Sequence, residues 1–78
     1  MKNERVKQIR RFKGMSQEQF ADWLGVSKSS IAHVESGHRN VSGHLSDMIA
    51  RKFDVLDDDF IEFCDRLEQT RKYFASRS

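Results

Sequence analysis

The amino-acid sequence predicts an all-α fold that consists of five helices. Apolar residues recur at helical spacing along almost the whole chain, and the alternation typical of strands is scarcely present. The 78 residues include no proline and only four glycines, so few interruptions of helix are written into the chain. This length predicts a single domain, residues 1–78, whose own core supplies only a few kcal/mol of net stability, so oligomerisation would help it.

Composition and charge limit the classes of protein to consider. Hydrophobic residues at 37% and charged residues at 33% are typical of a soluble helical domain and argue against disorder. The N-terminus is charged from its second residue, so neither a secretory signal nor a membrane span is expected. Residues 1–53 carry ten Lys/Arg against five Asp/Glu, whereas residues 54–78 carry four against seven. This division favours contact of the first part with a polyanion, although surface charge can also simply vary.

Serine and glycine residues predict where the helices begin and end. The Ser16 hydroxyl can accept from the backbone amide of Gln19, whose side chain can reach back, which is the pattern of a capping box. Gly14, Gly25 and Gly37 stand where a helix ends. The expected helices span residues 3–13, 16–24, 27–36, 42–53 and 57–74. The residues expected to face the core are Val6, Ile9, Phe20, Ala21, Leu24, Ile31, Val34, Leu45, Met48, Ile49 and Phe53.

Residues 16–35 predict two short helices joined by a sharp turn. Ala21 is small enough to let the helices approach closely, Gly25 supplies the turn, and Val26 fills the angle between them. The second helix of such a unit fits a DNA major groove about 12 Å wide.

The stretch MSQEQFADWLGVSKSSIAHVESG, residues 15–37, closely resembles the XRE family of helix-turn-helix regulators, which includes the lambda- and 434-repressor-like and Cro-like proteins. The likeness starts at Val6 and continues through Arg39 and Asn40 to residues 53–55. It implies a five-helix lambda-repressor-like DNA-binding domain. The extended C-terminal helix that the residues predict is the part least like the family. The resemblance further implies a transcription regulator, usually dimeric, that binds double-stranded DNA at a partly palindromic operator. The restriction–modification controllers and the phage repressors are the two types of regulator considered.

The resemblance also implies roles for individual residues. Gln17 resembles the glutamine that bonds a phosphate and supports the recognition helix. Arg10 and Glu35 correspond to a partly buried structural ion pair, and Arg10 can also lie near DNA. The residues expected to contact the DNA backbone are Gln17, Arg10, Ser27, His38, Arg39, Asn40 and Ser42.

The outward positions of the recognition helix follow from the inward positions of Ile31 and Val34. Lysine and histidine can donate to guanine, serine can donate or accept, and an alanine methyl can touch thymine. The residues expected to read bases are therefore Lys28, Ser29, Ala32 and His33.

Other residue patterns are weaker. The three histidines and Cys64 match no common zinc spacing, so no metal and no cofactor is expected. The single cysteine cannot form an internal disulfide, which suits a reducing cytoplasm. No nucleophilic constellation is present, so an enzyme is not expected. Trp23 is expected to pack on the last helix or to lie at a protein contact.

The C-terminal helix, residues 57–74, carries more apolar surface than one five-helix core needs. Several related regulators dimerise through their last helices, so the resemblance implies a homodimer built on this region. The expected interface residues are Phe60, Ile61, Phe63, Cys64, Leu67 and Phe74.

The sequence thus predicts a cytoplasmic, nucleoid-associated regulator, a dimeric repressor of a phage or bacterial promoter, with half-sites about one helical turn (~34 Å) apart. Activation through contact of Glu18 or Asp22 with RNA polymerase remains an alternative. Another is an antitoxin-like or antirepressor-bound module whose last helix holds a protein partner. A third is nonspecific nucleoid binding, which predicts steep salt dependence without sequence preference.

Overall fold

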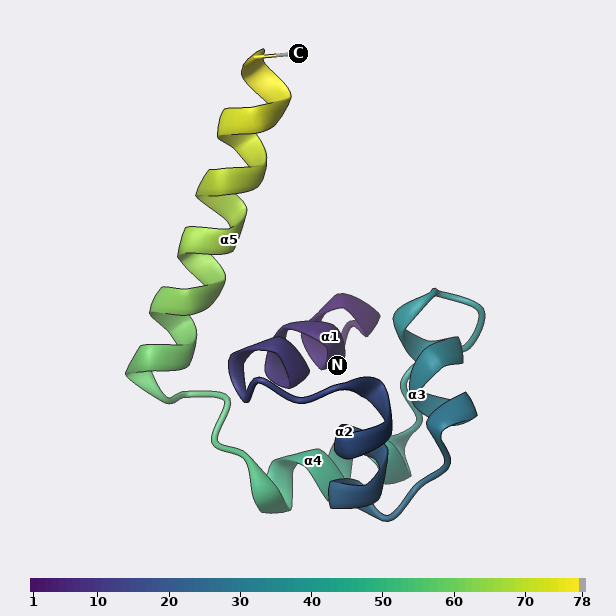
Figure 1. The fold of residues 1–78 in the computed structure, drawn as a ribbon. Helices are drawn as coiled ribbons and strands as arrows, with labels where there is room; N and C mark the ends of the chain where they lie inside the picture. Colours follow the sequence, from purple (N-terminus) through teal and green to yellow (C-terminus); the bar gives the residue numbers. More distant parts are fainter. Residues whose placement is uncertain (78) are drawn as a thin grey trace.

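The structure is a computed structural model that describes residues 1–77 of the chain, with the side chains of residues 1–75. This described part folds into five α-helices and contains no strand, so the all-α prediction is confirmed (Figure 1). The helices are α1 (Asn3–Phe12), α2 (Gln17–Leu24), α3 (Lys28–Glu35), α4 (Gly43–Lys52) and α5 (Asp58–Arg77).

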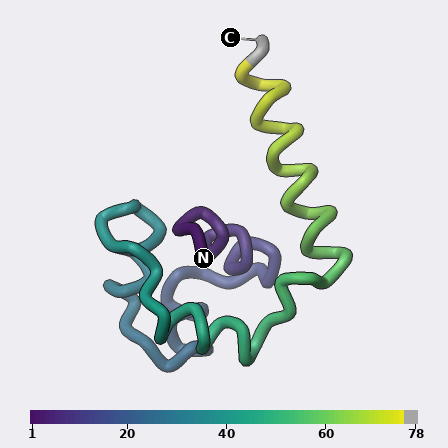
Figure 2. Tube along the Cα trace, turned by 180° about the vertical axis from the view of Figure 1, so that it is seen from behind, coloured from purple at the N-terminus to yellow at the C-terminus, as the bar shows by residue number. Residues whose placement is uncertain are grey.

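The first four helices gather into one body, and α5 stands beside it. Both opposite views show the C-terminal part of α5 extending away from the other four helices (Figures 1 and 2). The start of α5 lies against the body, because Phe60 belongs to the core. Farther along, the Arg71 guanidinium on α5 pairs with the Glu4 carboxylate on α1 at 2.6 Å.

The helix boundaries follow from local hydrogen bonds. The Gln19 amide donates to the Ser16 hydroxyl at 3.1 Å and the Ser16 amide donates to the Gln19 side chain at 2.9 Å, which confirms the capping box. The hydroxyls of Ser27 and Ser42 accept in the same way at the starts of α3 and α4. Gly25 ends α2 with φ 75°, a left-handed conformation that glycine adopts without a steric cost.

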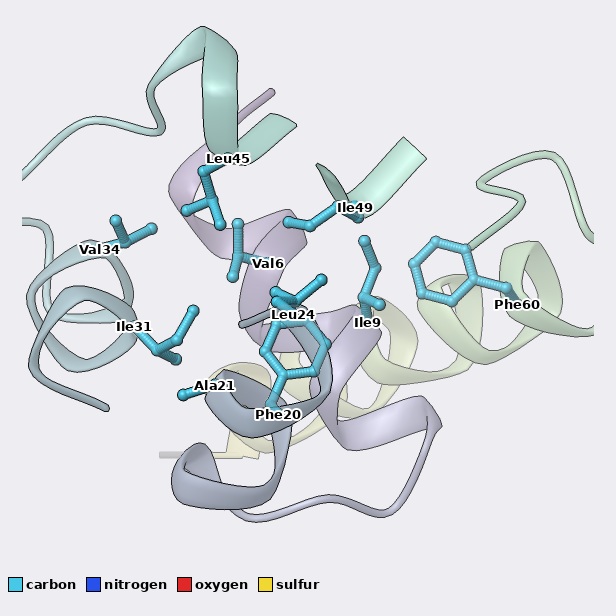
Figure 3. Packing of buried hydrophobic residues seen from close by; sticks show 10 residues of the cluster. All are labelled: Val6, Ile9, Phe20, Ala21, Leu24, Ile31, Val34, Leu45, Ile49 and Phe60. Atoms are coloured by element: carbon cyan, nitrogen blue, oxygen red, sulfur yellow. The ribbon is translucent and has the colours of Figure 1, made fainter. Parts of the chain in front are cut away.

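The core lies between the four short helices and the base of α5. The buried side chains point toward one another from all five helices (Figure 3). Phe60 is fully buried and its ring meets Phe12 at 5.4 Å and Phe53 at 5.0 Å, both edge to face. Phe63 meets the same Phe12 ring at 5.5 Å. This aromatic cluster fixes the base of α5 on the end of α1.

Three expectations need correction. The last helix begins at Asp58, because the Asp57 carboxylate caps it by accepting from the Phe60 amide at 3.1 Å. Met48 and Phe53 are half-buried, since they pack on the edge of the core and not within it. The ring of Trp23 lies against Phe20 and beneath two lysine ammonium groups instead of packing on the last helix.

The position of Phe60 generates a stability prediction. Phe60→Ala should lower the free energy of unfolding by about 3–5 kcal/mol, because it leaves a cavity within the aromatic cluster. Leu56→Ala is the matched control, since Leu56 is 75% exposed, and it should change stability by about 0.5 kcal/mol or less. Urea denaturation followed by circular dichroism measures both, and a Phe60→Ala protein that is already unfolded without urea also meets the expectation. Equal losses from the two variants would contradict the assignment of Phe60 to the core.

Candidate nucleic-acid interface

Helices α2 and α3 form a helix-turn-helix. Ala21 is 1% exposed, and its small side chain lets α3 approach α2 closely. The Val26 amide donates to the Ala21 carbonyl at 3.0 Å across the turn. On α3, Ile31 and Val34 are buried against the body. One face of α3 is therefore fixed by the core and the opposite face is presented to solvent.

The solvent-facing side of α3 carries the residues expected to read bases. Lys28, Ser29 and His33 are exposed, and Ala32 is half-buried. Within the described part of the chain, the Lys28 ammonium forms no ion pair. This face offers a cation, a hydroxyl, an imidazole and a methyl group to any surface that α3 meets.

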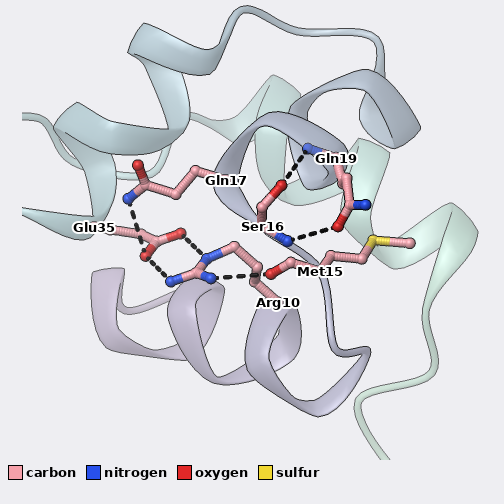
Figure 4. A network of polar contacts seen from close by, with 6 residues as sticks. All are labelled: Arg10, Met15, Ser16, Gln17, Gln19 and Glu35. Carbon is pink, nitrogen blue, oxygen red and sulfur yellow. Dashed lines mark hydrogen bonds and ion pairs between the residues drawn. The ribbon is translucent and has the colours of Figure 1, made fainter.

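An ion pair ties the end of α3 to α1. The Arg10 guanidinium contacts the Glu35 carboxylate at 2.7 Å and 2.9 Å through two nitrogens, and a third donates to the Met15 carbonyl at 3.0 Å (Figure 4). Only 15% of the Arg10 side chain and 4% of the Glu35 side chain are exposed. The hydrogen bond to Glu35 raises the pKa of Arg10, and burial opposes that effect. With these nitrogens engaged inside the protein, Arg10 has a structural role.

Gln17 connects this pair to the surface. It stands at the first position of α2 and its side-chain amide donates to the Glu35 carboxylate at 3.4 Å (Figure 4). The contact orients a half-buried amide at the N-terminus of a helix, where free backbone amides favour an anion.

The loop after α3, residues 36–42, is held by a residue that sequence reasoning missed. The Asn3 side chain donates to the carbonyls of Val34, at 2.8 Å, and Arg39, at 2.6 Å. The Arg39 amide in turn donates to the His33 carbonyl at 3.2 Å. No local pattern around Asn3 indicates these bonds, because they join positions more than thirty residues apart. The loop residues expected to contact a nucleic-acid backbone are exposed: His38, Arg39, Asn40 and Ser42. Ser27, at the start of α3, is exposed as well.

The residues expected at a dimer interface divide into three groups along α5. Phe60 is fully buried within its own chain, so its place in that set is a correction: its surface is covered by Phe12 and Phe53. The half-buried members lie along the body, and the exposed members are reachable by another molecule. The half-buried members are Phe63, Cys64 and Leu67, and the exposed members are Ile61 and Phe74.

The Cys64 thiol lies between side chains of α1. It accepts from the Arg5 guanidinium at 3.3 Å and donates to the Gln8 side-chain oxygen at 3.6 Å. Burial raises the pKa of the thiol, and Arg5 offsets part of that increase. A raised pKa disfavours the reactive thiolate, so this cysteine acts as a packing residue.

Trp23 joins the ends of three helices on another part of the body. The Lys13 and Lys52 ammonium groups lie 4.8 Å and 5.5 Å from the centroid of its ring, and Lys52 also donates to its backbone carbonyl at 2.6 Å. Cation–π contacts of this kind hold the C-terminal ends of α1, α2 and α4 together.

Residues 1–77 contain neither a candidate metal site nor a helix that could span a membrane. No group of three or more His, Cys, Asp or Glu side chains lies close enough together there to hold a metal ion. No helix in the same range has the length and apolar character needed to cross a membrane.

A profile of the helix-turn-helix family matches residues 6–60, which is more than half of the chain. The chain belongs to this helix-turn-helix family. The match spans α1 to the first turn of α5, so it includes the ion pair, the turn and the exposed face of α3. The resemblance to XRE-type DNA-binding transcription regulators is thereby confirmed.

Three curated relatives carry related names. The chain is 36% identical over 61 residues to the HTH-type transcriptional regulator AnsR of Bacillus subtilis. These aligned residues make up 78% of this chain and 53% of AnsR. It is also 36% identical over 61 residues to an uncharacterised HTH-type transcriptional regulator of Archaeoglobus fulgidus. That alignment covers 78% of this chain and 87% of the relative. With the antitoxin PezA of Streptococcus pneumoniae it shares 34% identity over 55 residues, 70% of this chain and 35% of PezA.

The alignments thus span about half of AnsR and about a third of PezA. No solved structure matches this chain.

The ion pair generates a second stability prediction. Glu35→Ala should lower the free energy of unfolding by about 3–5 kcal/mol, because it leaves the Arg10 charge buried and unpaired. The double variant Arg10→Met with Glu35→Leu should recover most of that loss, since no charge is then stranded. Glu62→Ala is the control: it removes the exposed Glu62–Arg66 pair and should cost about 0.5 kcal/mol or less. A double variant no more stable than Glu35→Ala in urea denaturation would refute this account.

Proposed function

We propose that this helix-turn-helix protein binds specific sequences in double-stranded DNA as a dimer and represses a phage or bacterial promoter. The observation that carries the proposal is the exposed face of α3, where polar side chains stand on a helix whose other face is fixed by the core. Lys28, Ser29, Ala32 and His33 read base edges in the major groove. Occupation of a promoter by such a protein excludes RNA polymerase, and the protein acts in the cytoplasm, where bacterial DNA lies.

Backbone contacts set the register of α3 on the duplex. Gln17 stands at the N-terminus of α2, Arg39 and Asn40 lie in the exposed loop, and Ser42 opens α4. Free amides at the starts of α2 and α4 favour phosphate oxygens. Because Asn3 holds the Arg39 backbone, the loop is oriented before DNA arrives.

The dimer is proposed to form through α5. Phe60, Leu67 and Phe74 are seven residues apart and share one face of the helix. Exposure to solvent increases along this face. Phe60 is buried by the protein's own core, Leu67 is half-buried, and Phe74 is 65% exposed. A second copy of α5 would cover the exposed end.

Charge supports an antiparallel arrangement of the two helices. The first turn of α5 contains Asp58 and Asp59, and its distal part contains Arg71 and Lys72, whose pairs with Glu4 and Glu68 are exposed. Two antiparallel copies place the acidic start of each helix opposite the basic end of the other, so the surface is self-complementary, as a two-fold dimer requires.

The similarity to an antitoxin favours a second candidate, a module whose α5 holds a different protein. The exposed position of Phe74 fits either occupant. If α5 forms a homodimer, loss of the Phe74 ring removes both self-association and tight DNA binding. If α5 holds a different protein, loss of this ring leaves the DNA affinity and the oligomeric state of the isolated protein unchanged.

The proposed function generates a prediction about sequence-specific DNA binding. Selection of bound duplexes from a random DNA pool should yield two related half-sites about one helical turn (~34 Å) apart. On the selected duplex Lys28→Ala should cost about 1–3 kcal/mol and relax the preference at one base pair, whereas Arg39→Ala should weaken selected and scrambled duplexes alike. A selection that enriches no sequence would refute the proposed function. Equal losses for Lys28→Ala on both duplexes would remove Lys28 from the reading set.

The proposed dimer generates a prediction of its own. Sedimentation equilibrium at tens of micromolar should find a dimer for the unmodified chain and a folded monomer for Phe74→Asp, because an aspartate at the tip of α5 leaves the core intact. Leu56→Asp is the matched exposed control and should remain a dimer. A monomeric unmodified protein without DNA would contradict the preformed dimer. Phe60→Asp cannot serve this purpose, since it would disrupt the core.

A further inference from the structure

The side chain of Asn3 joins the start of α1 to the end of α3 and to the loop that follows α3. Its Nδ2 donates to the Val34 carbonyl at 2.8 Å and to the Arg39 carbonyl at 2.6 Å. Both opposite views show the start of α1 beside this loop (Figures 1 and 2). A side-chain amide nitrogen carries two hydrogens, so these two bonds use the full donor capacity of Asn3.

The first of these bonds caps the recognition helix from outside. The Val34 carbonyl lies in the last turn of α3, where carbonyls have no partner within the helix. The Gly37 amide reaches the same carbonyl at 3.2 Å from the start of the loop. Asn3 adds a donor from α1, so the end of α3 is held by a second helix as well as by its own chain.

The second bond fixes the middle of an exposed loop. Residues 36–40 are all exposed, so the core does not hold them. The Arg39 amide donates to the His33 carbonyl at 3.2 Å, which ties the loop locally to α3. The bond from Asn3 holds the Arg39 carbonyl from the opposite side, so the backbone of this residue is held at both of its polar groups.

The first turn of α1 is itself anchored, so Asn3 is a fixed point for the loop. The Arg5 guanidinium lies 5.7 Å from the centroid of the buried Phe60 ring and donates to the Cys64 sulfur at 3.3 Å. Val6, on the next position of α1, is fully buried. The loop is therefore positioned relative to the core through Asn3. This residue precedes residue 6, where the family match begins, so the bonds belong to a part of the chain outside that match.

We propose that Asn3 is a positioning residue for DNA binding, which holds residues 38–40 in one arrangement relative to the recognition helix. The inference rests on the proposed function and deepens it. Both donor hydrogens of Asn3 are engaged within the protein, so the residue acts on DNA through the loop and not by contact. Without these bonds the loop samples more arrangements, and the cost of ordering it falls on DNA binding.

The first test measures duplex affinity by fluorescence anisotropy. Asn3→Ala should weaken the selected and the scrambled duplex alike by about tenfold, because the loop contacts the DNA backbone and not the bases. Gln8→Ala is the matched control, since Gln8 is another half-buried amide on α1 and accepts from the Cys64 thiol instead of contacting the loop. Its affinity should stay within about twofold of the unmodified protein.

A second variant removes the donors without shortening the side chain. Asn3→Asp keeps the shape of the side chain, and a carboxylate in the first turn favours the start of α1. An ionised carboxylate has no hydrogen to donate, so this variant should bind DNA no more tightly than Asn3→Ala. Circular dichroism establishes that each variant is folded.

A double-mutant cycle tests whether Asn3 acts through the loop. In a protein that already carries Arg39→Ala, the loop has lost its cation, so Asn3→Ala should cost about threefold or less instead of about tenfold. An equal loss in both backgrounds would show that Asn3 acts independently of Arg39 and would overturn the inference.

Hydrogen exchange separates local positioning from a general loss of stability. In the free protein Asn3→Ala should accelerate exchange of the Arg39 amide by about tenfold, while the Val26 amide, which is bonded across the turn between α2 and α3, keeps its rate. NMR spectroscopy measures both amides in one sample. Equal acceleration of the two amides would assign Asn3 to the stability of the whole fold and would overturn the inference.

The remaining outcomes distinguish this inference from the proposed function. An unmodified protein that binds no duplex refutes the proposed function. If the unmodified protein binds and either Asn3 variant binds as tightly, only the positioning role fails. A loss confined to the selected duplex also overturns it, because Asn3 would then affect the reading of bases by α3.

Discussion

The bidentate pair between Arg10 and Glu35 is the interaction on which the presentation of the recognition helix depends. It joins the last turn of α1 to the last turn of α3, and it reaches Gln17 through the same carboxylate. Removing two charges from water costs several kcal/mol each, and their attraction roughly offsets that cost. The pair therefore contributes orientation more than net stability. It holds the end of α3 on α1, while the burial of Ile31 and Val34 sets which face of α3 turns inward and which is exposed.

Features set by neighbouring residues could be predicted from the sequence. The capping box of Ser16 and Gln19 needs only four consecutive residues, and the turn at Gly25 needs only one residue without a side chain. The inward and outward faces of α3 follow from helical spacing, so the exposure of Lys28 and His33 could also be predicted from the sequence. The resemblance located the Arg10–Glu35 pair, because its two members stand at matching positions of a family motif.

Features set by distant residues could not be predicted. Helical spacing shows that one face of α5 is apolar, but it does not show where the chain's own core stops covering it. The spacing therefore groups Phe60 with Phe74, although Phe12 and Phe53 bury the first, whereas the second lies beside Tyr73 and stays 65% exposed. The bonds from Asn3 to the loop depend on how α1 lies against α3, which no local pattern reports.

The shape of α5 makes it a lever. Its 20 residues span roughly 30 Å at the 1.5 Å rise of an α-helix, and its fulcrum is the aromatic cluster around Phe60. A tilt of about 10° at that fulcrum displaces the far end by about 5 Å over this length. The exposed Glu4–Arg71 contact resists such a tilt only weakly. In the proposed dimer, the ring packing of Phe12, Phe53 and Phe60 would thus set the distance between the two α3 helices.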